Sequence, residues 1–300
     1  MKVLSVGECM VELSGTGEPG QWRSGFAGDT LNTAWYLRAL LPADWSVDYL
    51  TAVGTDPLSD AMLDFLSQAG IGTGAIARHP TRVPGLYMID LKDGERSFTY
   101  WRDSSAARTL ADDPARLDAA FATADVVYFS GITIGILTPE ARATLFAALE
   151  RARAAGKTVV FDPNLRPKLW PSGEAMCAAT TEAARRADIV LPSHDDEAHW
   201  FGDASPEATA RRYLALGAGE VLVKNGGAEM VLGTDQGLSE IPAMERVKPV
   251  DTTGAGDSFN GGYLAARLTG VPAAEAVARG HGVAMKVVMH RGALMPVSAL

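Results

Sequence analysis

The chain has 300 residues, 47% apolar and 21% charged, which is an average composition for a globular protein with a large core. This composition excludes disordered, collagen-like and low-complexity proteins, and a content of two cysteines excludes a small scaffold held by disulfides. The 27 basic and 36 acidic residues give a net charge of −9, which opposes binding to nucleic acid because that affinity rests on Lys and Arg at phosphates.

The sequence favours a cytoplasmic protein. Cys9 and Cys177 lie far apart in the chain, so we expect no disulfide framework and a reducing compartment. Free cysteine behaves as a small hydrophobic residue, so we expect both to be buried. The first residues lack an apolar run long enough for a signal peptide, since Glu8 and Glu12 interrupt it. No stretch reaches about 18 apolar residues without a charge, so we expect no membrane helix and no membrane partner.

Short strand patterns alternate with longer helix patterns, which predicts an α/β fold with a mostly parallel sheet. The predicted strands, in chain order, cover residues 2–6, 46–53, 125–129, 158–161, 189–191 and 220–223. The predicted helices, with apolar residues at every third or fourth position, cover residues 56–69, 138–155, 174–187 and 206–216. Pro139 directly after Thr138 is typical of a helix start, and Gly70 and Gly156 are typical of left-handed caps after helix ends.

One segment breaks this alternation. Residues 86–91 and 96–102 have strand patterns and flank Asp93-Gly94, which predicts a β-hairpin, and residues 21–27 are a further candidate strand beside it. No linker or repeat marks a second independent domain. We therefore expect one domain over residues 1–300, in which residues 10–27 and 83–106 form a small β lid.

The most informative stretch is Asp-Thr-Thr-Gly-Ala-Gly-Asp-Ser-Phe-Asn-Gly-Gly-Tyr at 251–263. A Gly-Ala-Gly turn that leads into a helix leaves backbone N–H groups free to bind a phosphate. Asp257, in the first helical turn, would lie beside that phosphate and could accept a proton from a hydroxyl. Alternatively, Asp257 only stabilises its own helix. The full thirteen-residue string favours the first interpretation.

This string resembles the second signature of the ribokinase-like, or PfkB, family of carbohydrate kinases, whose core is Asp-Thr-x-Gly-Ala-Gly-Asp. The resemblance implies a three-layer α/β/α fold with a mostly parallel sheet and a small β lid. It also implies ATP and Mg²⁺, and leaves open a monovalent cation such as K⁺ near the loop at Asp251. In the family the turn is the anion hole and the last Asp is the catalytic base. These roles would fall on Gly254, Ala255, Gly256 and Asp257.

The segment Gly-Asp-Thr-Leu-Asn-Thr-Ala at 28–34 resembles the first signature of the family. By this resemblance Gly28, Asp29 and Asn32 would face the sugar hydroxyls, which short polar side chains at a helix start can bind. The alternative is that Asp29 caps the helix and Gly28 serves only the preceding turn.

The family resemblance also places a nucleotide site on the later loops. The segment at 224–228 is similar to the Lys-x-Gly-x-x-Gly region of the family, although its glycines could serve only a tight turn. The residues that would bind ATP are Ser193, Lys224, Gly226, Gly227, Gly254, Gly256 and His281. Where the family has Asn-x-x-Glu with magnesium, residues 193–197 lack the Asn, and Asp196 and Glu197 would act largely through water and phosphate. No P-loop and no familiar His spacing for zinc is present.

Two arginines at ends of predicted sheet elements point to an acidic substrate. Arg102 and Arg166 lie near aromatic and hydroxyl residues, and a guanidinium group can hold both oxygens of a carboxylate. Either arginine could instead form a structural salt bridge or lie on the surface. The surrounding strings resemble the 2-keto-3-deoxygluconate kinases of the family. This resemblance implies that Tyr87, Tyr100, Arg102 and Arg166 contact an acid sugar.

The expected activity is therefore ATP-dependent phosphorylation of 2-keto-3-deoxy-D-gluconate at its 6-hydroxyl, with an acid sugar and ATP as small-molecule partners. Two alternatives remain: a kinase of a neutral sugar such as fructose or ribose, and a catalytically silent relative that senses sugars. The apolar face of the lid hairpin would suit contact with a second copy, so we expect a homo-oligomer.

Overall fold

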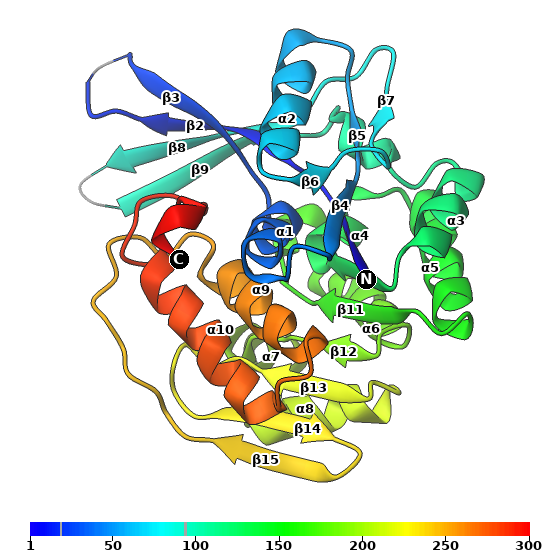
Figure 1. Ribbon diagram of the computed structural model, residues 1–300, viewed down its shortest axis with the longest axis vertical. Coiled ribbons are helices and arrows are strands. Elements are labelled where there is room, and N and C mark those ends of the chain that lie inside the picture. The colour runs from blue at the N-terminus through cyan, green and yellow to red at the C-terminus, as the bar shows by residue number, and fades with distance from the viewer. Residues whose placement is uncertain (19, 93–94) are drawn as a thin grey trace.

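The computed structural model describes residues 1–18, 20–92 and 95–300, and among them nine strands form the main sheet (Figure 1). The strand order is β15-β14-β13-β12-β11-β10-β1-β4-β6. Neighbouring strands pair in parallel along the part of this order that runs from β13 to β6. The pairs β13 with β14 and β14 with β15 are antiparallel. These strands are β1 (Lys2–Val6), β4 (Ser46–Leu50), β6 (Ile71–Gly72), β10 (Val126–Ser130), β11 (Thr158–Asp162), β12 (Ile189–Val190), β13 (Glu220–Val223), β14 (Met230–Thr234) and β15 (Gly237–Ile241).

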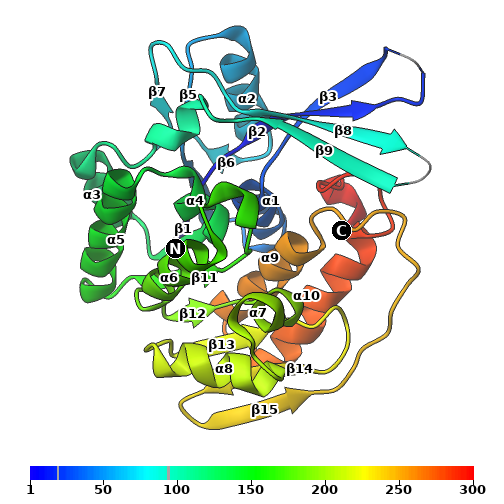
Figure 2. The same ribbon diagram turned by 180° about the vertical axis from the view of Figure 1, so that it is seen from behind.

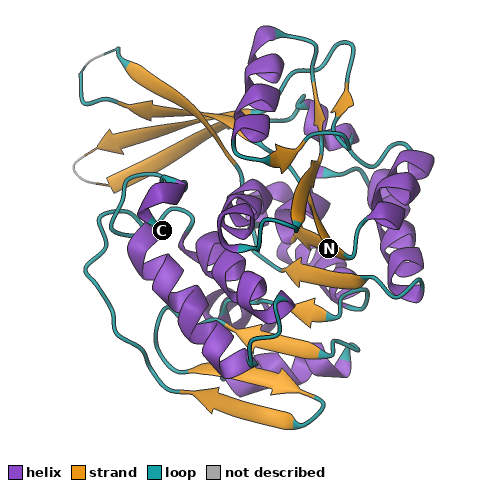
Figure 3. Cartoon of the chain, viewed as in Figure 1, coloured by secondary structure: helices purple, strands orange, loops and turns teal. Residues whose placement is uncertain are grey.

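Helices cover both faces of the main sheet (Figure 3). One core lies under α1 (Asp29–Leu40), α2 (Pro57–Gln68), α9 (Ala255–Leu268) and α10 (Ala273–Val287). The other lies under α3 (Pro114–Thr123), α4 (Gly131–Ile136), α5 (Pro139–Ala154), α6 (Gly173–Ala184) and α8 (Pro206–Ala215). Successive strand residues alternate between the two cores, as Val126 and Val127 do, because side chains of a strand point to opposite faces. The predicted three-layer α/β/α fold is confirmed.

Local signals determine several helix ends. The Thr138 side chain accepts a hydrogen bond from the Ala141 amide at the start of α5, and Pro139 is its first residue. Gly70 and Gly156 adopt left-handed φ values of 72° and 80° after α2 and α5, as predicted. The three short 3-10 helices in the described ranges are η1 (Ala106–Thr109), η2 (Pro167–Leu169) and η3 (Val297–Ala299).

The predicted strand at 46–53 is interrupted, which the sequence pattern did not show. The chain leaves the main sheet after β4, and β5 (Ala52–Val53) pairs instead with β7 (Ala77–Arg78) in a small parallel ladder. The Thr51 carbonyl, between β4 and β5, accepts a hydrogen bond from the Ala77 amide. The interruption is therefore a tertiary effect.

Four strands form a second sheet, which we call the small sheet and which projects from the body (Figures 1 and 2). Its order is β3 (Trp22–Ala27), β2 (Met10–Gly15), β8 (Leu86–Lys92), β9 (Glu95–Trp101). The segment at 21–27 thus contributes a strand to the sheet of the hairpin, as predicted, but β2 lies between this strand and the hairpin. The Asp93-Gly94 turn lies outside the described residues. That the small sheet acts as a lid stays a prediction.

The cysteines differ in their surroundings. Cys9 is buried and Cys177 is only half-buried, contrary to expectation, because its thiol faces the end of α7 (His194–Phe201) and donates to the Trp200 carbonyl at 3.5 Å. Neither cysteine forms a disulfide. None of the helices in the described ranges combines the length and the apolar character needed to cross a bilayer.

Candidate active site

The two predicted signature segments meet at the carboxyl ends of the parallel strands, where open α/β sheets bind ligands. Helix α1 begins at Asp29, helix α9 begins at Ala255, and the two helices pack together. Asn32 Nδ2 donates to Asp257 Oδ2 at 2.8 Å. Residues 225 positions apart in the sequence are therefore side by side.

The glycine turn before α9 has the conformation that the sequence pattern favours. Gly254 has φ 74°, and a Cβ atom there would lie 2.9 Å from Ala293 Cβ, so glycine is needed for both conformation and space. The Ala255 amide donates to Thr252 O at 3.2 Å. Of the predicted anion hole, Ala255 therefore does not offer its amide. The amides of Gly254, Gly256 and Asp257, in contrast, meet no acceptor within the part of the chain that the structure describes. They are the amides of this turn that an anion can use.

The Asp257 carboxyl group lies in an acidic, poorly hydrated place. Burial, and next the negative charge of Asp29, raise the pKa of Asp257 to about 7, although the hydrogen bond from Asn32 opposes the shift. A carboxylate with this pKa is a competent proton acceptor near neutral pH. An acidic residue that only stabilised its own helix would not need these neighbours.

Asp29 is not the cap of α1. The N-cap is Gly28, where a Cβ atom would lie 2.1 Å from the Glu8 carbonyl oxygen, so only glycine allows this close approach. The Asp29 carboxylate accepts hydrogen bonds from the Thr30 amide and from Asn164 Nδ2, both at 2.8 Å. Burial raises the pKa of Asp29 even though these bonds lower it. The capping interpretation of Asp29 is therefore wrong, while its role toward a sugar stays a prediction.

Arg102 lies where the small sheet meets the main sheet. Its Nη2 donates to Glu8, whose carboxylate is nearly fully buried and also accepts from Ser105 Oγ at 2.6 Å. Arg102 Nε is buried and finds no acceptor among the described residues. The guanidinium is thus anchored at one nitrogen and has a further donor to offer.

The predicted tyrosines lie on the paired strands β8 and β9. Tyr87 is buried and donates a hydrogen bond to Glu12, while its cross-strand partner Tyr100 is about half exposed. The two ring centroids are 5.8 Å apart. Arg102 lies 5.8 Å from the Tyr100 ring centroid, so the structure brings Tyr87, Tyr100 and Arg102 together.

The other predicted arginine, Arg166, is exposed in the loop after β11, with Nη1 on the Leu165 carbonyl. Its charge reaches Asp196 on α7: burial raises the pKa of Asp196, and Arg166 partly opposes the shift. Lys224 acts in the same direction as Arg166. Arg166 and Asp196 therefore border the same charged region.

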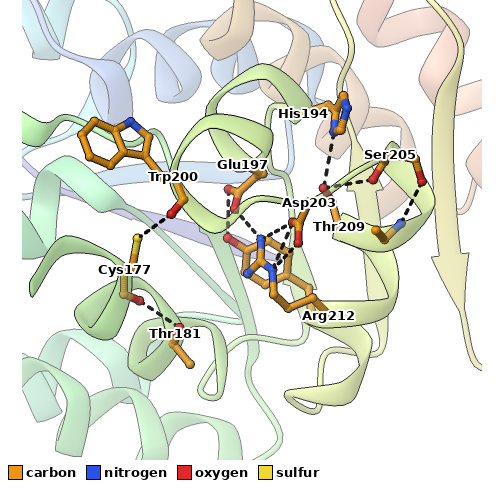
Figure 4. Close-up of polar contacts among 11 residues, drawn as sticks. Cys177, Thr181, His194, Glu197, Trp200, Asp203, Ser205, Thr209 and Arg212 are labelled. Atoms are coloured by element: carbon orange, nitrogen blue, oxygen red, sulfur yellow. Dashed lines mark hydrogen bonds and ion pairs between the residues drawn. The ribbon is translucent and has the colours of Figure 1, made fainter. Parts of the chain in front are cut away.

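Glu197 has different neighbours from Asp196. It is fully buried and accepts hydrogen bonds from Arg212 at 2.6 Å and Tyr213 at 2.9 Å, between α7 and α8 (Figure 4). Of the two predicted metal ligands, Asp196 alone lies among the charges of the site. The described residues contain no group of three acidic, His or Cys side chains able to hold a metal by themselves. One carboxylate with substrate phosphates and water is, however, an ordinary environment for Mg²⁺.

The predicted nucleotide residues lie around the turn after β13. Gly226 and Gly227 have left-handed φ values of 54° and 80°. A Cβ atom on Gly227 would lie 3.5 Å from His281 Cε1, so these two residues are neighbours although they are distant in sequence. Ser193 is the N-cap of α7, and its backbone pairs with that of Lys224 in an isolated parallel β-bridge. The structure therefore brings these residues to one end of the sheet.

Comparison with known proteins identifies the family. The model of the pfkB family carbohydrate kinases matches residues 1–299. The chain belongs to this family. It is therefore a sugar kinase, and the ribokinase-like fold agrees with solved structures of the family.

Curated relatives match this pfkB kinase over its full length. It is 40% identical to the 2-dehydro-3-deoxygluconokinase of Escherichia coli K12, over 100% of this chain and 98% of that enzyme. It is 41% identical to the 2-dehydro-3-deoxygluconokinase of Dickeya dadantii, over 98% and 97%. A fructokinase of Vibrio alginolyticus is 32% identical, over 71% of this chain and 68% of that protein.

Solved structures show the same fold. A PfkB protein from Polaromonas sp. JS666 has a TM-score of 0.87 at 29% identity and covers 97% of each chain. A fructokinase from Xylella fastidiosa with bound ATP has a TM-score of 0.82 at 25% identity, over 100% of this chain and 94% of that one. ATP-dependent phosphoryl transfer is the activity of this family.

Several polar residues of the pfkB kinase site were not predicted from its sequence. Lys224, which was predicted at the nucleotide, joins a buried network beneath α9 with three residues that were not predicted: Asp162, Asn260 and Tyr128. A signal did exist for Asp162, which directly follows the predicted strand at 158–161 and precedes Pro163 and Asn164. Glu8, in contrast, has no local signal for its partnership with Arg102, 94 positions away.

Proposed function

We propose that this kinase transfers the γ-phosphoryl group of ATP to the 6-hydroxyl of 2-keto-3-deoxygluconate, which is also called 2-dehydro-3-deoxygluconate. The observation that carries the proposal is Asp257: a carboxylate with a pKa of about 7, held by Asn32 beside the free amides of a glycine turn. The names of the full-length relatives support the choice of sugar.

In the proposed reaction, Asp257 accepts the proton of the sugar hydroxyl as its oxygen forms a bond to the γ-phosphorus. The bond between that phosphorus and the β,γ-bridging oxygen breaks, and ADP leaves with the electron pair. The amides of Gly256 and Asp257 donate to the transferred group and stabilise its negative charge. Magnesium would neutralise phosphate charge, and Asp196 would hold it through water and phosphate oxygens. A monovalent cation near Asp251 stays a prediction.

The donors around the small sheet support an acid substrate over a neutral one. Arg102 is anchored by Glu8 and keeps Nε without an acceptor among the described residues. Arg166 is exposed in the loop after β11 and carries a second guanidinium group, whose charge reaches Asp196. A carboxylate binds two guanidinium nitrogens with one oxygen each and adds a negative charge, whereas a hydroxyl offers a single neutral oxygen. We therefore assign Tyr87, Tyr100 and both arginines to the acid end of the sugar.

An assay of ADP release over a small panel of sugars tests the proposal. We expect kcat/KM for 2-keto-3-deoxygluconate to exceed the values for fructose and ribose by about tenfold or more, since a charge-assisted hydrogen bond contributes about 1.5–3 kcal/mol. Equal or faster turnover of a neutral sugar would instead support a fructokinase-like or ribokinase-like enzyme. Absence of turnover with every sugar would support a silent, sugar-sensing relative.

Replacing Glu8 and Arg102 together by Gln should raise KM for the acid sugar by about 10–100-fold, with little change in KM for ATP or in turnover of fructose. The double variant is needed because Arg102→Gln alone leaves the buried Glu8 charge unpaired, which costs about 3–5 kcal/mol of stability. Steady-state kinetics on both sugars check the result. The matched control is the same exchange at Glu220 and Arg267, a 2.6 Å ion pair at the other end of α9. An unchanged KM for the acid would contradict the carboxylate role.

Asp196→Asn should raise the Mg²⁺ concentration for half-maximal activity by about tenfold or more, because loss of a group that orients a bound metal typically weakens binding 10–100-fold. Glu197→Gln is its neighbour and control. It should leave the Mg²⁺ requirement unchanged, since Glu197 faces Arg212 and Tyr213. Titration of activity with Mg²⁺ distinguishes the two variants, and an effect of Glu197→Gln alone would reverse our assignment.

A homo-oligomer through the small sheet also stays a proposal. Trp22, Phe98 and Trp101 expose 38%, 39% and 54% of their surface on strands of this sheet. Large exposed apolar side chains on one element favour contact with another protein surface. Sedimentation equilibrium of the wild type and of a Trp101→Lys variant would test it.

A further inference from the structure

Lys224 is a buried lysine beneath the glycine turn. It follows β13, is 8% exposed, and its Nζ lies 3.0 Å from Asn260 Oδ1 and 3.4 Å from Asp162 Oδ1. The same Nζ lies 3.9 Å from the position that a Cβ atom on Gly256 would occupy. The ammonium group is therefore fixed directly under the turn whose amides are free.

The two partners of Lys224 also tie it to the helix of Asp257. Asn260 lies three residues after Asp257 in α9 and donates from Nδ2 to Asp162 Oδ2 at 2.8 Å and to the Tyr128 hydroxyl at 3.2 Å. Asp162 and Asn260 are 4% and 0% exposed. A buried network with its polar atoms paired holds its charges in one place, so the Lys224 charge cannot swing into solvent.

Burial of a lysine ammonium group costs folding free energy unless the charge is closely paired and hydrogen-bonded. The carboxylate of Asp162 at 3.4 Å is a long ion pair, and three acidic residues converge here around a single ammonium group. The groups that face Asp257 are Asp29, Asn32 and Tyr36 from α1, Tyr128 from β10, Asp162 from β11 and Lys224 from the end of β13. Asp29 and Asp162 oppose the charged form of Asp257, while Lys224 and Asn32 favour it.

We propose that Lys224 is a positioning residue for phosphoryl transfer, whose fixed positive charge under Gly256 keeps Asp257 ionised when the anionic phosphoryl group occupies the turn. The inference rests on the proposed role of Asp257 as base. A phosphoryl group adds negative charge beside a carboxylate that already faces Asp29 and Asp162. Without a nearby cation the carboxylate would bind a proton and could not accept the one from the sugar. In this proposal Lys224 acts through its charge and exchanges no proton with the substrate.

The main test is Lys224→Met, which removes the charge and keeps a chain of similar length. Loss of a nearby positive charge raises the pKa of a carboxyl group, so we expect the acidic limb of the pH profile to move up by about one unit. For a shift of one unit, the single-turnover rate falls about tenfold at pH 6 and less than about twofold at pH 9. A purely structural role would lower the rate by the same factor at both pH values, and that result would overturn the inference.

Lys224→Gln separates charge from hydrogen bonding, because Gln can still donate to Asp162 or Asn260 but is neutral. We expect it to shift the profile as Lys224→Met does. If Lys224→Gln kept the pH profile of the wild type, Lys224 would act only through its hydrogen bonds. That result would also overturn the inference.

A measurement without substrate keeps the inference testable if the chain fails to phosphorylate the acid sugar. Carboxyl ¹³C NMR, with the Asp257 signal assigned from Asp257→Asn, should show a higher titration midpoint in both Lys224 variants than in the wild type. An unchanged midpoint overturns the inference, whatever the substrate is.

Discussion

Asp257→Asn should lower kcat by about 10²–10⁴-fold, the usual contribution of a general base. The variant keeps the shape of the side chain and an oxygen that can accept from Asn32, but it cannot take the proton of the sugar hydroxyl. We expect it to be at least as stable as the wild type at pH 8. A carboxyl group whose pKa is raised by folding costs stability once it ionises, and Asn removes that cost. Single-turnover kinetics and thermal unfolding check the two statements.

The pH dependence supplies a second signature of the same group. Because Asp257 acts in its ionised form and has a pKa of about 7, kcat/KM should fall tenfold per pH unit below about pH 7 and be level above it. The residual activity of Asp257→Asn should lack this acidic limb. The matched control is Asp60→Asn, which removes an acidic residue from the first turn of α2 and should leave kcat unchanged. Near-normal turnover in Asp257→Asn would refute the assignment of the base.

Gly254→Ala should reduce kcat by about 10²–10³-fold, which is the effect of losing one donor from an anion hole. The new Cβ atom would lie 2.9 Å from Ala293 Cβ and 3.0 Å from Ala293 Cα. The turn must therefore move, and the free amides of Gly256 and Asp257 move with it. Measurement of kcat with saturating ATP and sugar tests the effect.

Gly156→Ala is the control for Gly254→Ala. Gly156 has a similar left-handed φ of 80°, and a Cβ atom there would have no neighbour within 4 Å. Both variants carry the backbone strain of about 1–2 kcal/mol that a left-handed L-residue pays, but only Gly254→Ala disturbs the turn. The expected pattern is loss of activity in Gly254→Ala alone, with a loss of stability at least as large as that of Gly156→Ala. Full activity in Gly254→Ala would remove the turn from the mechanism.

The parts of the fold that were predicted from sequence are those with local causes. Strands such as 158–161 and helices such as 138–155 follow from the period of their apolar residues, and the ends at Gly70 and Gly156 follow from left-handed caps. The division of 46–53 into β4 and β5 has no local cause, because it depends on the hydrogen bond between Thr51 and Ala77.

The same distinction applies to the site. The glycine turn was predictable because consecutive residues determine both its conformation and the start of the helix that follows. The partners of Glu8 and Lys224 were not, since Arg102 and Asn260 come from remote segments. Asp196 and Glu197 show a third limit. Adjacent residues on a helix point about 100° apart, so residues that are neighbours in sequence can have different surroundings in the fold.

The net charge of −9 gives little information about the site itself. The free amides of Gly256 and Asp257, the buried Lys224 and the arginines at 102 and 166 provide local attraction for anions. Dipoles and charges at close range in a poorly hydrated place act more strongly than distant surface charges, which salt screens.

The parallel pairing of β2 with β8 constrains how this architecture can be re-engineered. Val11 is in register with Leu86, so the small sheet is assembled from two stretches of chain separated by the whole unit of α1, β4 and α2. It cannot be transplanted between kinases as one cassette. A chimaera that exchanges sugar specificity must replace both stretches together and keep their mutual register, because a shift of one residue would turn Tyr87 to the opposite face.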